Sequence, residues 1–474
     1  MLEKWRKPAF AAFLVAWFVY FSWDGLRVHF APDDMMNIDS FYWTPGPWRL
    51  VYSQFLIWRG YYRPMGGLFY LPILAGWGLN PVPYHVTLSL VLLANVCLVY
   101  CFARRLGCGE LAAGLAALVA CYHAGIANLY YNTAFVYDAL CGFFYLGALV
   151  YYIRIRARGR LLRPGETLVF TALLVCALNS KEMALTLPAV LLAYEWVYHP
   201  PIRHAKKELA DWLRGPGRTS MIAGALTLVD LYGKMYGHDQ LTGPGYTPVF
   251  SWDRLLDFQT TFLRDVLFLH AGFSGVVAFW LVVTYLAWRP AARPVLRFCW
   301  LFLLLTPLPI EFLPGKSQAC LYIPMLGATV FASVVFVDWA WALASGLTAE
   351  RLFRRFSRGA LLTGILLVAL FYWGRENLHN KRTNVTPVMT ALGRQTWEVI
   401  EQFRALHPQV RPGSHVVFMR DPFQEWDMLF IADLWFRDRS VTVRLQRLTP
   451  LAPEQIARSD YLYDYSDGKL LRVK

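Results

Sequence analysis

Charged residues are scarce in this chain. Of its 474 residues, 16% are Asp, Glu, Lys or Arg, whereas 57% are hydrophobic and 16% aromatic. A soluble domain usually carries about 25% charged residues. The shortage therefore excludes an ordinary soluble protein and indicates that lipid forms much of the solvent.

The sequence also lacks the short motifs of several familiar classes. It has no nucleotide-binding P-loop, no dinucleotide fingerprint, no internal repeat and no low-complexity tract. None of its eight cysteines forms a Cys-x-x-Cys pair, and most lie in or near hydrophobic runs. We therefore expect the cysteines to be small buried apolar side chains.

What the chain does have is a series of strongly apolar runs. Several approach the roughly 20 residues that cross a bilayer, and the shorter ones need their flanks to do so. They predict about eleven transmembrane helices, over residues 8–23, 82–103, 111–122, 134–153, 167–178, 184–198, 220–236, 271–288, 295–312, 319–343 and 360–373. The first is expected to be a retained anchor, because no small-x-small cleavage motif follows it.

The formal net charge of +14 comes from clusters of Lys and Arg between these runs. If the spans alternate, every cluster falls on one side: residues 4–7, 104–105, 154–163, 203–218, 289–297 and 351–358. The positive-inside rule then places the N-terminus in the cytoplasm and, with an odd number of spans, the C-terminal end outside. The basic charge is thus explained by topology, and no nucleic-acid partner is expected.

Two outward segments are long. The loop of residues 24–81 contains an aromatic stretch, Trp48–Trp58, with the spacing of an amphipathic interfacial helix, and an apolar segment, Met65–Trp77, that we expect to be half embedded. The second loop, residues 237–270, predicts a surface helix near Asp253–Phe268. Both loops would lie over the outer ends of the spans.

Composition changes after Trp373. Residues 374–474 predict a small soluble α/β domain, with helices at 389–406 and 425–436, strands at 416–419 and 441–445, and a hairpin at 461–473 turned by Ser466-Asp467-Gly468. Residues 1–373 would form the membrane domain. The acids Asp421, Glu425 and Asp427 are expected to mark a helix N-terminus.

Ionisable side chains at membrane depth are costly, so their positions are informative. With the topology above they gather at the outer boundary: Asp33, Asp34, Arg63, Asp138, Lys181, Glu182, Asp230, Lys234, Glu311 and Lys316. Each has a simpler explanation. Asp230 and Lys234 fit a same-helix ion pair, and Asp138 fits a helix cap or a hydrogen bond to a neighbour. Glu311 and Lys316 fit solvated interfacial positions, and Asp33-Asp34 fits an exposed pair in a loop. Their coincidence at one depth favours a shared role.

Such a layer suits a lipid-linked substrate, whose tail stays in the bilayer while its phosphate lies at the interface. Lys and Arg would bind the phosphate as it becomes the leaving group. A carboxylate would take the proton from an attacking hydroxyl or amine. The sequence therefore predicts group transfer at the outer membrane boundary.

Four segments in this order resemble the C-type integral membrane glycosyltransferases, in their protein O-mannosyltransferase-like branch. They are the acid pair Asp33-Asp34 after the first span, Tyr61-Tyr62-Arg63-Pro64-Met65, residues 180–188 (SKEMALTLP) and Cys320-Leu321-Tyr322-Ile323-Pro324. The likeness covers roughly residues 8–373. It implies an inverting transfer of a sugar, of the hexosyl type, from a polyprenyl-phosphate donor to a protein, lipid or glycan acceptor.

The resemblance also implies roles for individual residues. Asp34 or Asp33 would be the catalytic base. Arg63 and Lys181, with Lys316 and Lys234, would hold the donor phosphate. The residues that would orient the substrates are Glu182, Asp138, Tyr62 and Tyr322.

The chain departs from those relatives in two ways. It lacks tetratricopeptide repeats and ends in an α/β domain, so acceptor choice does not carry over. It also has Lys316-Ser317-Gln318-Ala319 where an acid and an arginine would precede the tyrosine, which puts the role of that segment in question. A divalent metal is an open alternative to metal-free catalysis, with Asp33, Asp34, Asn37 and Asp39 as oxygen ligands.

Two other classes remain. A transporter, flippase or polymerase of lipid-linked saccharides would need charged groups along a path through both leaflets, whereas the inner halves of the spans look almost free of charge. A scaffold presenting the C-terminal domain would leave the outer acids and bases unused. We therefore expect a membrane glycosyltransferase, in a bacterial inner membrane.

Overall fold

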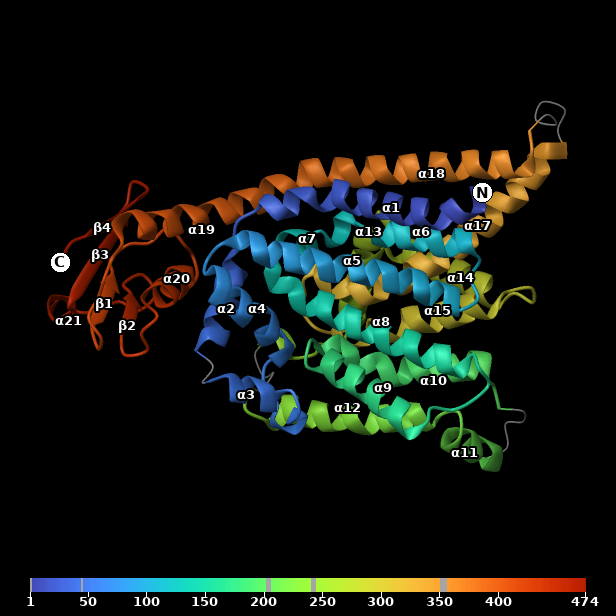
Figure 1. The fold of residues 1–474 in the computed structure, drawn as a ribbon, viewed down its shortest axis with the longest axis horizontal. Helices are drawn as coiled ribbons and strands as arrows, with labels where there is room; N and C mark the ends of the chain where they lie inside the picture. Colours follow the sequence, from blue (N-terminus) through green and yellow to red (C-terminus); the bar gives the residue numbers. More distant parts are fainter. Residues whose placement is uncertain (1, 44–45, 202–205, 240–243, 350–355) are drawn as a thin grey trace.

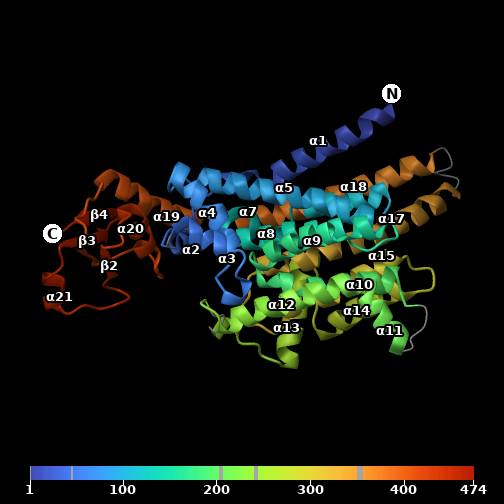
Figure 2. The same cartoon turned by 60° about the horizontal axis from the view of Figure 1, so that its bottom comes forward.

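The computed structural model describes residues 2–43, 46–201, 206–239, 244–349 and 356–474. Within them the chain forms a long bundle of helices with a small α/β unit at one end (Figure 1 and Figure 2). It is a polytopic helical membrane protein: six helical stretches are long and apolar enough to cross a bilayer, at Pro8–Arg27, Pro81–Arg105, Thr133–Arg156, Pro294–Glu311, Gln318–Thr348 and Arg358–Leu406.

Each of the eleven apolar runs is helical, and these helices lie along the length of the bundle (Figure 1). They are α1 (Leu2–Ser22), α5 (Pro81–Arg105), α6 (Glu110–Ala120), α8 (Val136–Arg156), α9 (Pro164–Leu178), α10 (Leu187–Tyr198), α12 (Arg218–Tyr236), α14 (Phe273–Trp288), α15 (Pro294–Leu305), α17 (Tyr322–Ala349) and α18 (Arg358–Asn380). Several begin at Pro, whose fixed φ suits the first helical position.

Shorter elements connect the long helices. The first long loop, residues 24–81, folds into α2 (Pro32–Tyr42), α3 (Gly46–Ser53) and α4 (Pro64–Trp77), so the predicted amphipathic helix ends at Ser53, well before Trp58. The second contains α13 (Trp252–Leu267), close to the predicted surface helix. The remaining helices are α7 (Asn128–Tyr131), α11 (Lys206–Arg214) and α16 (Leu308–Glu311). The 3₁₀ turns are η1 (Trp23–Arg27), η2 (Ile57–Arg59), η3 (Ala124–Ile126), η4 (Thr133–Phe135), η5 (Glu182–Thr186), η6 (Pro244–Tyr246) and η7 (Gln318–Leu321).

The helix α18 does not end at Trp373, where the last predicted span ends. It continues through one π-helical segment, η8 (Lys381–Val385), into α19 (Thr386–Leu406), so a continuous helical stretch passes the predicted domain boundary at residue 373. The buried Lys381 ammonium at this junction donates to the carbonyl of Phe21 at 2.7 Å and lies 2.9 Å from the Asp24 carboxylate. These contacts tie the stretch to the end of α1.

The C-terminal unit has a four-stranded sheet in the order β2-β1-β3-β4. Strand β1 (His415–Phe418) is parallel to β2 (Thr442–Leu445) and to β3 (Tyr461–Ser466), and β3 is antiparallel to β4 (Lys469–Arg472). The helix α20 (Asp427–Phe436) links β1 to β2, and α21 (Pro453–Ala457) precedes β3. Asp467 and Gly468 both have positive φ, as a two-residue hairpin turn requires, which confirms the predicted hairpin.

Helix α20 packs against α2, so the C-terminal unit covers the first α-helix of residues 24–81. At the end of this interface the Tyr42 hydroxyl donates to the carbonyl of Arg437 at 3.1 Å, and Arg439 donates to the carbonyl of Trp43 at 2.9 Å. The α/β unit therefore holds the helix that carries the two candidate acids.

Candidate functional site

Asp33 and Asp34, which the sequence placed at the start of the long loop of residues 24–81, lie in the first turn of α2. Pro32 provides the favourable first position, and two acids complement the positive end of the helix dipole. Asp34 is fully buried. Its two carboxylate oxygens accept hydrogen bonds from the Thr133 hydroxyl at 2.6 Å and the Ala31 amide at 2.7 Å. Asp34 therefore anchors α2 to the turn before α8.

The two acids differ in what surrounds them. Burial raises the pKa of Asp34 to about 7, although the donors from Thr133 and Ala31 act against this. Asp33 is exposed, and its carboxylate has no hydrogen-bond or ion-pair partner among the residues that the structure describes. Partial desolvation still raises the pKa of Asp33. Of the pair, only Asp33 has carboxylate oxygens free to meet a substrate.

Arg63 and Glu182 form the centre of the cation cluster. Arg63 Nη2 lies 2.8 Å from Glu182 Oε2, and its Nε donates to Oε1 at 3.3 Å, so the pair is bidentate. The Arg63 backbone is left-handed, with φ of 38°, a strained conformation often found at functional sites. The pKa of Glu182 reflects two opposing effects: burial raises it, but the Arg63 and Lys234 cations outweigh burial and lower it overall.

Two aromatic rings frame the Arg63 guanidinium. Its carbon lies 4.8 Å from the ring centre of Tyr62 and 5.1 Å from that of Tyr137, and Nη1 donates to the Tyr62 hydroxyl at 2.9 Å. Tyr137 in turn donates to Asn37 on α2 at 2.6 Å. A continuous set of contacts therefore joins the Arg63–Glu182 pair to the helix that carries Asp33.

The lysines of the cluster have different partners. Lys181 Nζ lies 2.6 Å from the Asp138 carboxylate. Lys234 lies 3.3 Å from Asp230, which confirms the predicted same-helix pair, and it also donates to the carbonyl of Leu178 at 2.9 Å. These interactions hold both ammonium groups within the protein.

Lys316 is different. Its ammonium lies 3.8 Å from the ring centre of Tyr246, and among the described residues no carboxylate pairs with it. Burial lowers the pKa of Lys316. The same Tyr246 hydroxyl accepts a long hydrogen bond, 3.4 Å, from Arg63, so Lys316 belongs to the cluster.

The cluster carries a surplus of positive charge. Its four cations, Arg63, Lys181, Lys234 and Lys316, face the carboxylates of Glu182, Asp138 and Asp230. Every predicted phosphate-binding residue is therefore in this one region, together with predicted orienting residues Glu182, Asp138 and Tyr62.

Tyr322 and Glu311 lie outside the cluster. Tyr322 is buried, and its ring fills the space beside Gly142 of α8 and Asn95 of α5. Glu311 accepts a hydrogen bond from Gln259 of α13 at 2.6 Å. The structure thus places Tyr322 as a packing residue between helices, rather than among the groups that could face a substrate.

The four proposed metal ligands do not converge. Asp34, Asn37 and Asp39 accept short hydrogen bonds from Thr133, Tyr137 and Trp43, respectively. Among the described residues, no group of three or more His, Cys, Asp and Glu side chains is arranged to hold a metal ion. The residues present do not fit the metal alternative.

Three contributors were not apparent from the sequence. Thr133 binds Asp34, Tyr137 bridges α2 to Arg63, and Tyr246 of η6 meets both Arg63 and Lys316. Thr133 and Tyr137 lie four residues apart at the start of one helical stretch, Tyr246 lies far from them in the chain, and no local motif marks any of the three. Only the tertiary fold brings these side chains to the acids and cations.

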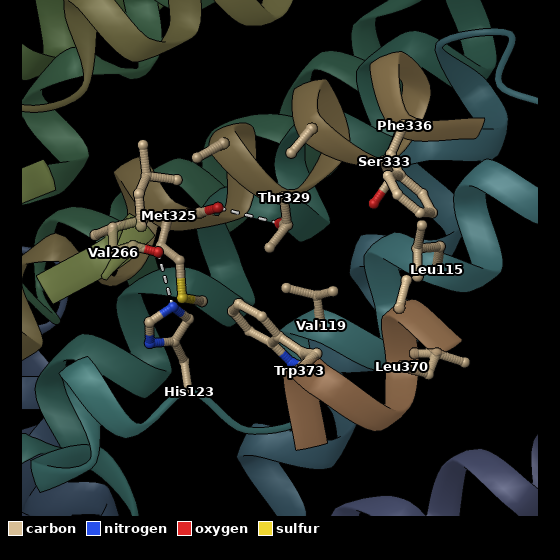
Figure 3. A pocket seen from close by; sticks show the side chains of 14 residues that line it. Leu115, Val119, His123, Val266, Met325, Thr329, Ser333, Phe336, Leu370 and Trp373 are labelled. Carbon is tan, nitrogen blue, oxygen red and sulfur yellow. Dashed lines mark hydrogen bonds between the residues drawn. The ribbon is translucent and has the colours of Figure 1, made fainter. Parts of the chain in front are cut away.

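A separate apolar cavity lies along α17. Its volume is about 250 Å³, and Figure 3 shows His123 and Met325 at one end, Phe336 at the other and Trp373 between them. His123 accepts from the Gly125 amide and bonds to the carbonyl of Val266 at 2.9 Å, so its ring nitrogens are engaged. The cavity contains no residue of the cation cluster and fits a hydrocarbon chain better than a polar ligand.

The end of the bundle that the sequence predicts to be cytoplasmic holds a buried ion pair that no sequence motif marks. Arg156 of α8 contacts both oxygens of Glu195 of α10, at 2.7 and 2.8 Å. Tyr152 donates to the same carboxylate at 2.6 Å. The Glu195 side chain is fully buried and that of Arg156 is 6% exposed. The halves of the helices that the sequence predicts to be inner are therefore not free of charge, because this pair is buried between α8 and α10.

Comparison with known proteins found no matching family model and no match among curated proteins. Solved structures do resemble the chain. ArnT from Cupriavidus metallidurans, bound to undecaprenyl phosphate, is 14% identical with a TM-score of 0.49, over 92% of this chain and 85% of that one. The Archaeoglobus fulgidus oligosaccharyltransferase, tethered to an acceptor peptide, is 11% identical with a TM-score of 0.48, over 90% of this chain and 63% of that one.

The apo form of the same oligosaccharyltransferase is 12% identical, with a TM-score of 0.49, over 92% of this chain and 64% of its own length.

Proposed function

We propose that this protein is a membrane glycosyltransferase that moves a sugar from a polyprenyl-phosphate donor to an acceptor at the membrane surface. The observation that carries the proposal is the cluster of four cations and three carboxylates, linked through Tyr137 to the helix that bears Asp33. A net positive site at the ends of membrane helices suits a lipid phosphate.

Lys316 and Arg63 are the proposed contacts of the donor phosphate. Negative charge grows on the phosphate as the bond between it and the sugar breaks, so a nearby cation stabilises the transition state more than the ground state. Lys316 has no competing carboxylate, whereas Arg63 is held by Glu182 and supplies its remaining N–H groups. Lys181 and Lys234 would act mainly through their charge, since both are already paired.

Asp33 is the proposed base. The acceptor hydroxyl or amine would attack the anomeric carbon as its proton passes to the Asp33 carboxylate, and the donor phosphate would leave with the electrons of the broken bond. The free carboxylate oxygens of Asp33 support this role. Asp34 would position the helix, since both of its oxygens already accept hydrogen bonds. Glu182 and Asp138 would keep the cations in place.

The topology belongs to the proposal. Eleven spans with the basic clusters in the cytoplasm put the cation cluster, Asp33 and the α/β unit on the outer side, in a bacterial inner membrane. The acceptor, whether protein, lipid or glycan, would then approach from outside.

A transporter of lipid-linked saccharides is the second candidate. The buried Arg156–Glu195 pair provides charge near the inner end of the spans, as a transport path would need. Its members, however, satisfy each other and are shielded from solvent. That arrangement is typical of a structural pair, and it favours the transferase.

The test is a transfer assay on the purified protein in nanodiscs, with radiolabelled polyprenyl-phosphate sugar and a membrane extract as acceptor. We expect label to move from lipid to acceptor in wild type, and Lys316→Met to lower the rate at least about tenfold. The control Lys469→Met removes an exposed lysine of the α/β unit and should leave the rate unchanged. Movement of intact donor across vesicle membranes without bond cleavage would instead establish the transporter.

A further inference from the structure

A polar face, apart from the cation cluster, lies on the long helical stretch that joins the bundle to the α/β unit. Arg382, Thr386, Thr390 and Arg394 follow one another at intervals of four residues, which places them on one side of a helix. Together with Asp24 they line a cavity of about 410 Å³. None of them belongs to the cation cluster described above.

The arginines of this face are available for binding. Arg382 and Arg394 are exposed, and neither side chain has a hydrogen-bond or ion-pair partner within the described ranges. Asp24, the acid of the cavity, is already paired with Lys381 at 2.9 Å. The face therefore combines two free guanidinium groups with the Thr390 hydroxyl.

The position of the face is at the edge of the membrane region. Asp24 lies near the end of the apolar stretch Pro8–Arg27, and Arg382 follows the apolar part of α18. Figure 1 shows α1 and α18 leading toward α19 along the same side of the molecule. Large aromatic side chains are exposed on the segments of α1, η1 and α18 that precede this face in the chain: Tyr20, Trp23, Phe371 and Tyr372. Such rings are typical of the lipid–water boundary.

We propose that this face binds the phosphate-bearing headgroup of a membrane lipid. Guanidinium groups recognise phosphate by paired N–H donors, and a threonine hydroxyl adds a further donor. The lipid tails would lie on the apolar surfaces of α1 and α18, which a free anion could not use. This site is distinct from the proposed donor site and does not depend on the proposed function.

The bound lipid would lie next to residues that hold α2 in place. Thr386 shares a hydrogen bond of 3.2 Å with the Tyr131 hydroxyl, in the segment that leads to Thr133, the partner of Asp34. Three residues after Arg394, Trp397 of α19 stacks on His29, which lies just before α2, with ring centres 4.3 Å apart. Headgroup binding would thus stabilise the contact between the long helix and the start of α2.

Native mass spectrometry of the purified full-length protein in detergent tests this proposal. Phosphatidylglycerol, phosphatidylcholine and inorganic phosphate are titrated separately against wild type and Arg382→Gln/Arg394→Gln. We expect phosphatidylglycerol to bind wild type more tightly than either other ligand, and the double substitution to weaken that binding roughly 20-fold. A second variant, Thr390→Trp, keeps the charge but fills the cavity and should also reduce binding.

The matched control is Arg444→Gln/Arg458→Gln, which removes two exposed arginines of the α/β unit. Equal weakening by this control would show a general charge effect and overturn the site. Unchanged binding in Arg382→Gln/Arg394→Gln would overturn it as well. Inorganic phosphate bound as tightly as the lipid would refute the assignment to a lipid headgroup.

Discussion

At the scale of single residues, adjacent acids have different environments. Asp34 is enclosed by hydrogen bonds from Thr133 and Ala31, whereas the carboxylate of Asp33 has no partner within the described chain. The sequence shows two equivalent acids, and the helical turn separates them by about 100° around the axis. One side chain then points into the protein and the other does not.

The buried ion pair Arg156–Glu195 gives a prediction about stability. Glu195→Gln would leave the Arg156 guanidinium in an apolar interior without a counter-charge, because the carboxylate that it contacts twice would be lost. We expect the free energy of unfolding to fall by about 3–5 kcal/mol, measured by thermal denaturation in detergent.

The control for this prediction is Arg160→Gln. Arg160 also pairs with a carboxylate, that of Glu166, but the pair is partly exposed to solvent. Water replaces such a partner, so little change in Tm is expected. Equal effects of the two substitutions would show that burial does not set the value of the Arg156–Glu195 pair.

At the scale of elements, the interface between α2 and α20 contains several acids. Burial raises the pKa of Asp39 and Asp427 to about 6 and that of Asp433 to about 7. The negative charge of Asp33 on α2 raises the pKa of Asp427 on α20 further, and that of Asp39 raises the pKa of Asp433. The cations at the end of the interface are Arg437 and Arg439.

These shifts predict that stability depends on pH. The folded pKa values lie above the ordinary Asp value of about 4, so the folded protein holds more protons than the unfolded chain between about pH 4 and 7. Stability is therefore greatest below this window and falls as pH rises through it. Asp433→Asn should raise Tm by roughly 2–4 °C at pH 8 and have little effect at pH 5.

Asp467→Asn is the control, since it removes an exposed acid at a turn position that Asn also tolerates. It should shift Tm equally little at both pH values. A stabilisation by Asp433→Asn that is the same at pH 5 and pH 8 would contradict ionisation at the interface.

Much of the element structure could be predicted from composition and periodicity. All eleven apolar runs are helices, and the hairpin turn follows from the conformational preferences of Asp467-Gly468. The sequence could not predict that Arg63 meets Tyr246, or Arg156 meets Glu195, because each contact joins residues far apart in the chain. The sequence shows which residues carry charge, but the tertiary fold determines which of those charges lack a partner among the described residues.

At the scale of the whole molecule, the α/β unit and the cation cluster should share one side of the membrane. Alkaline phosphatase fused after Lys474 should be active in a bacterial host, since the enzyme folds with its disulfides only outside the cytoplasm. Green fluorescent protein fused at the same position should remain dark, because it does not become fluorescent when it is exported in an unfolded state. A bright fluorescent fusion and an inactive phosphatase fusion would reverse the proposed orientation.

The proposed mechanism of sugar transfer depends most directly on Asp33 as the base, and the transfer assay in nanodiscs measures that role. Asp33→Asn should lower the rate of sugar transfer by about 100-fold or more without a large fall in Tm, because a general base is lost but no side-chain hydrogen bond is. Asp34→Asn should lower Tm, since it weakens the contact with Thr133. Transfer that survives Asp33→Asn at the wild-type rate would contradict the account.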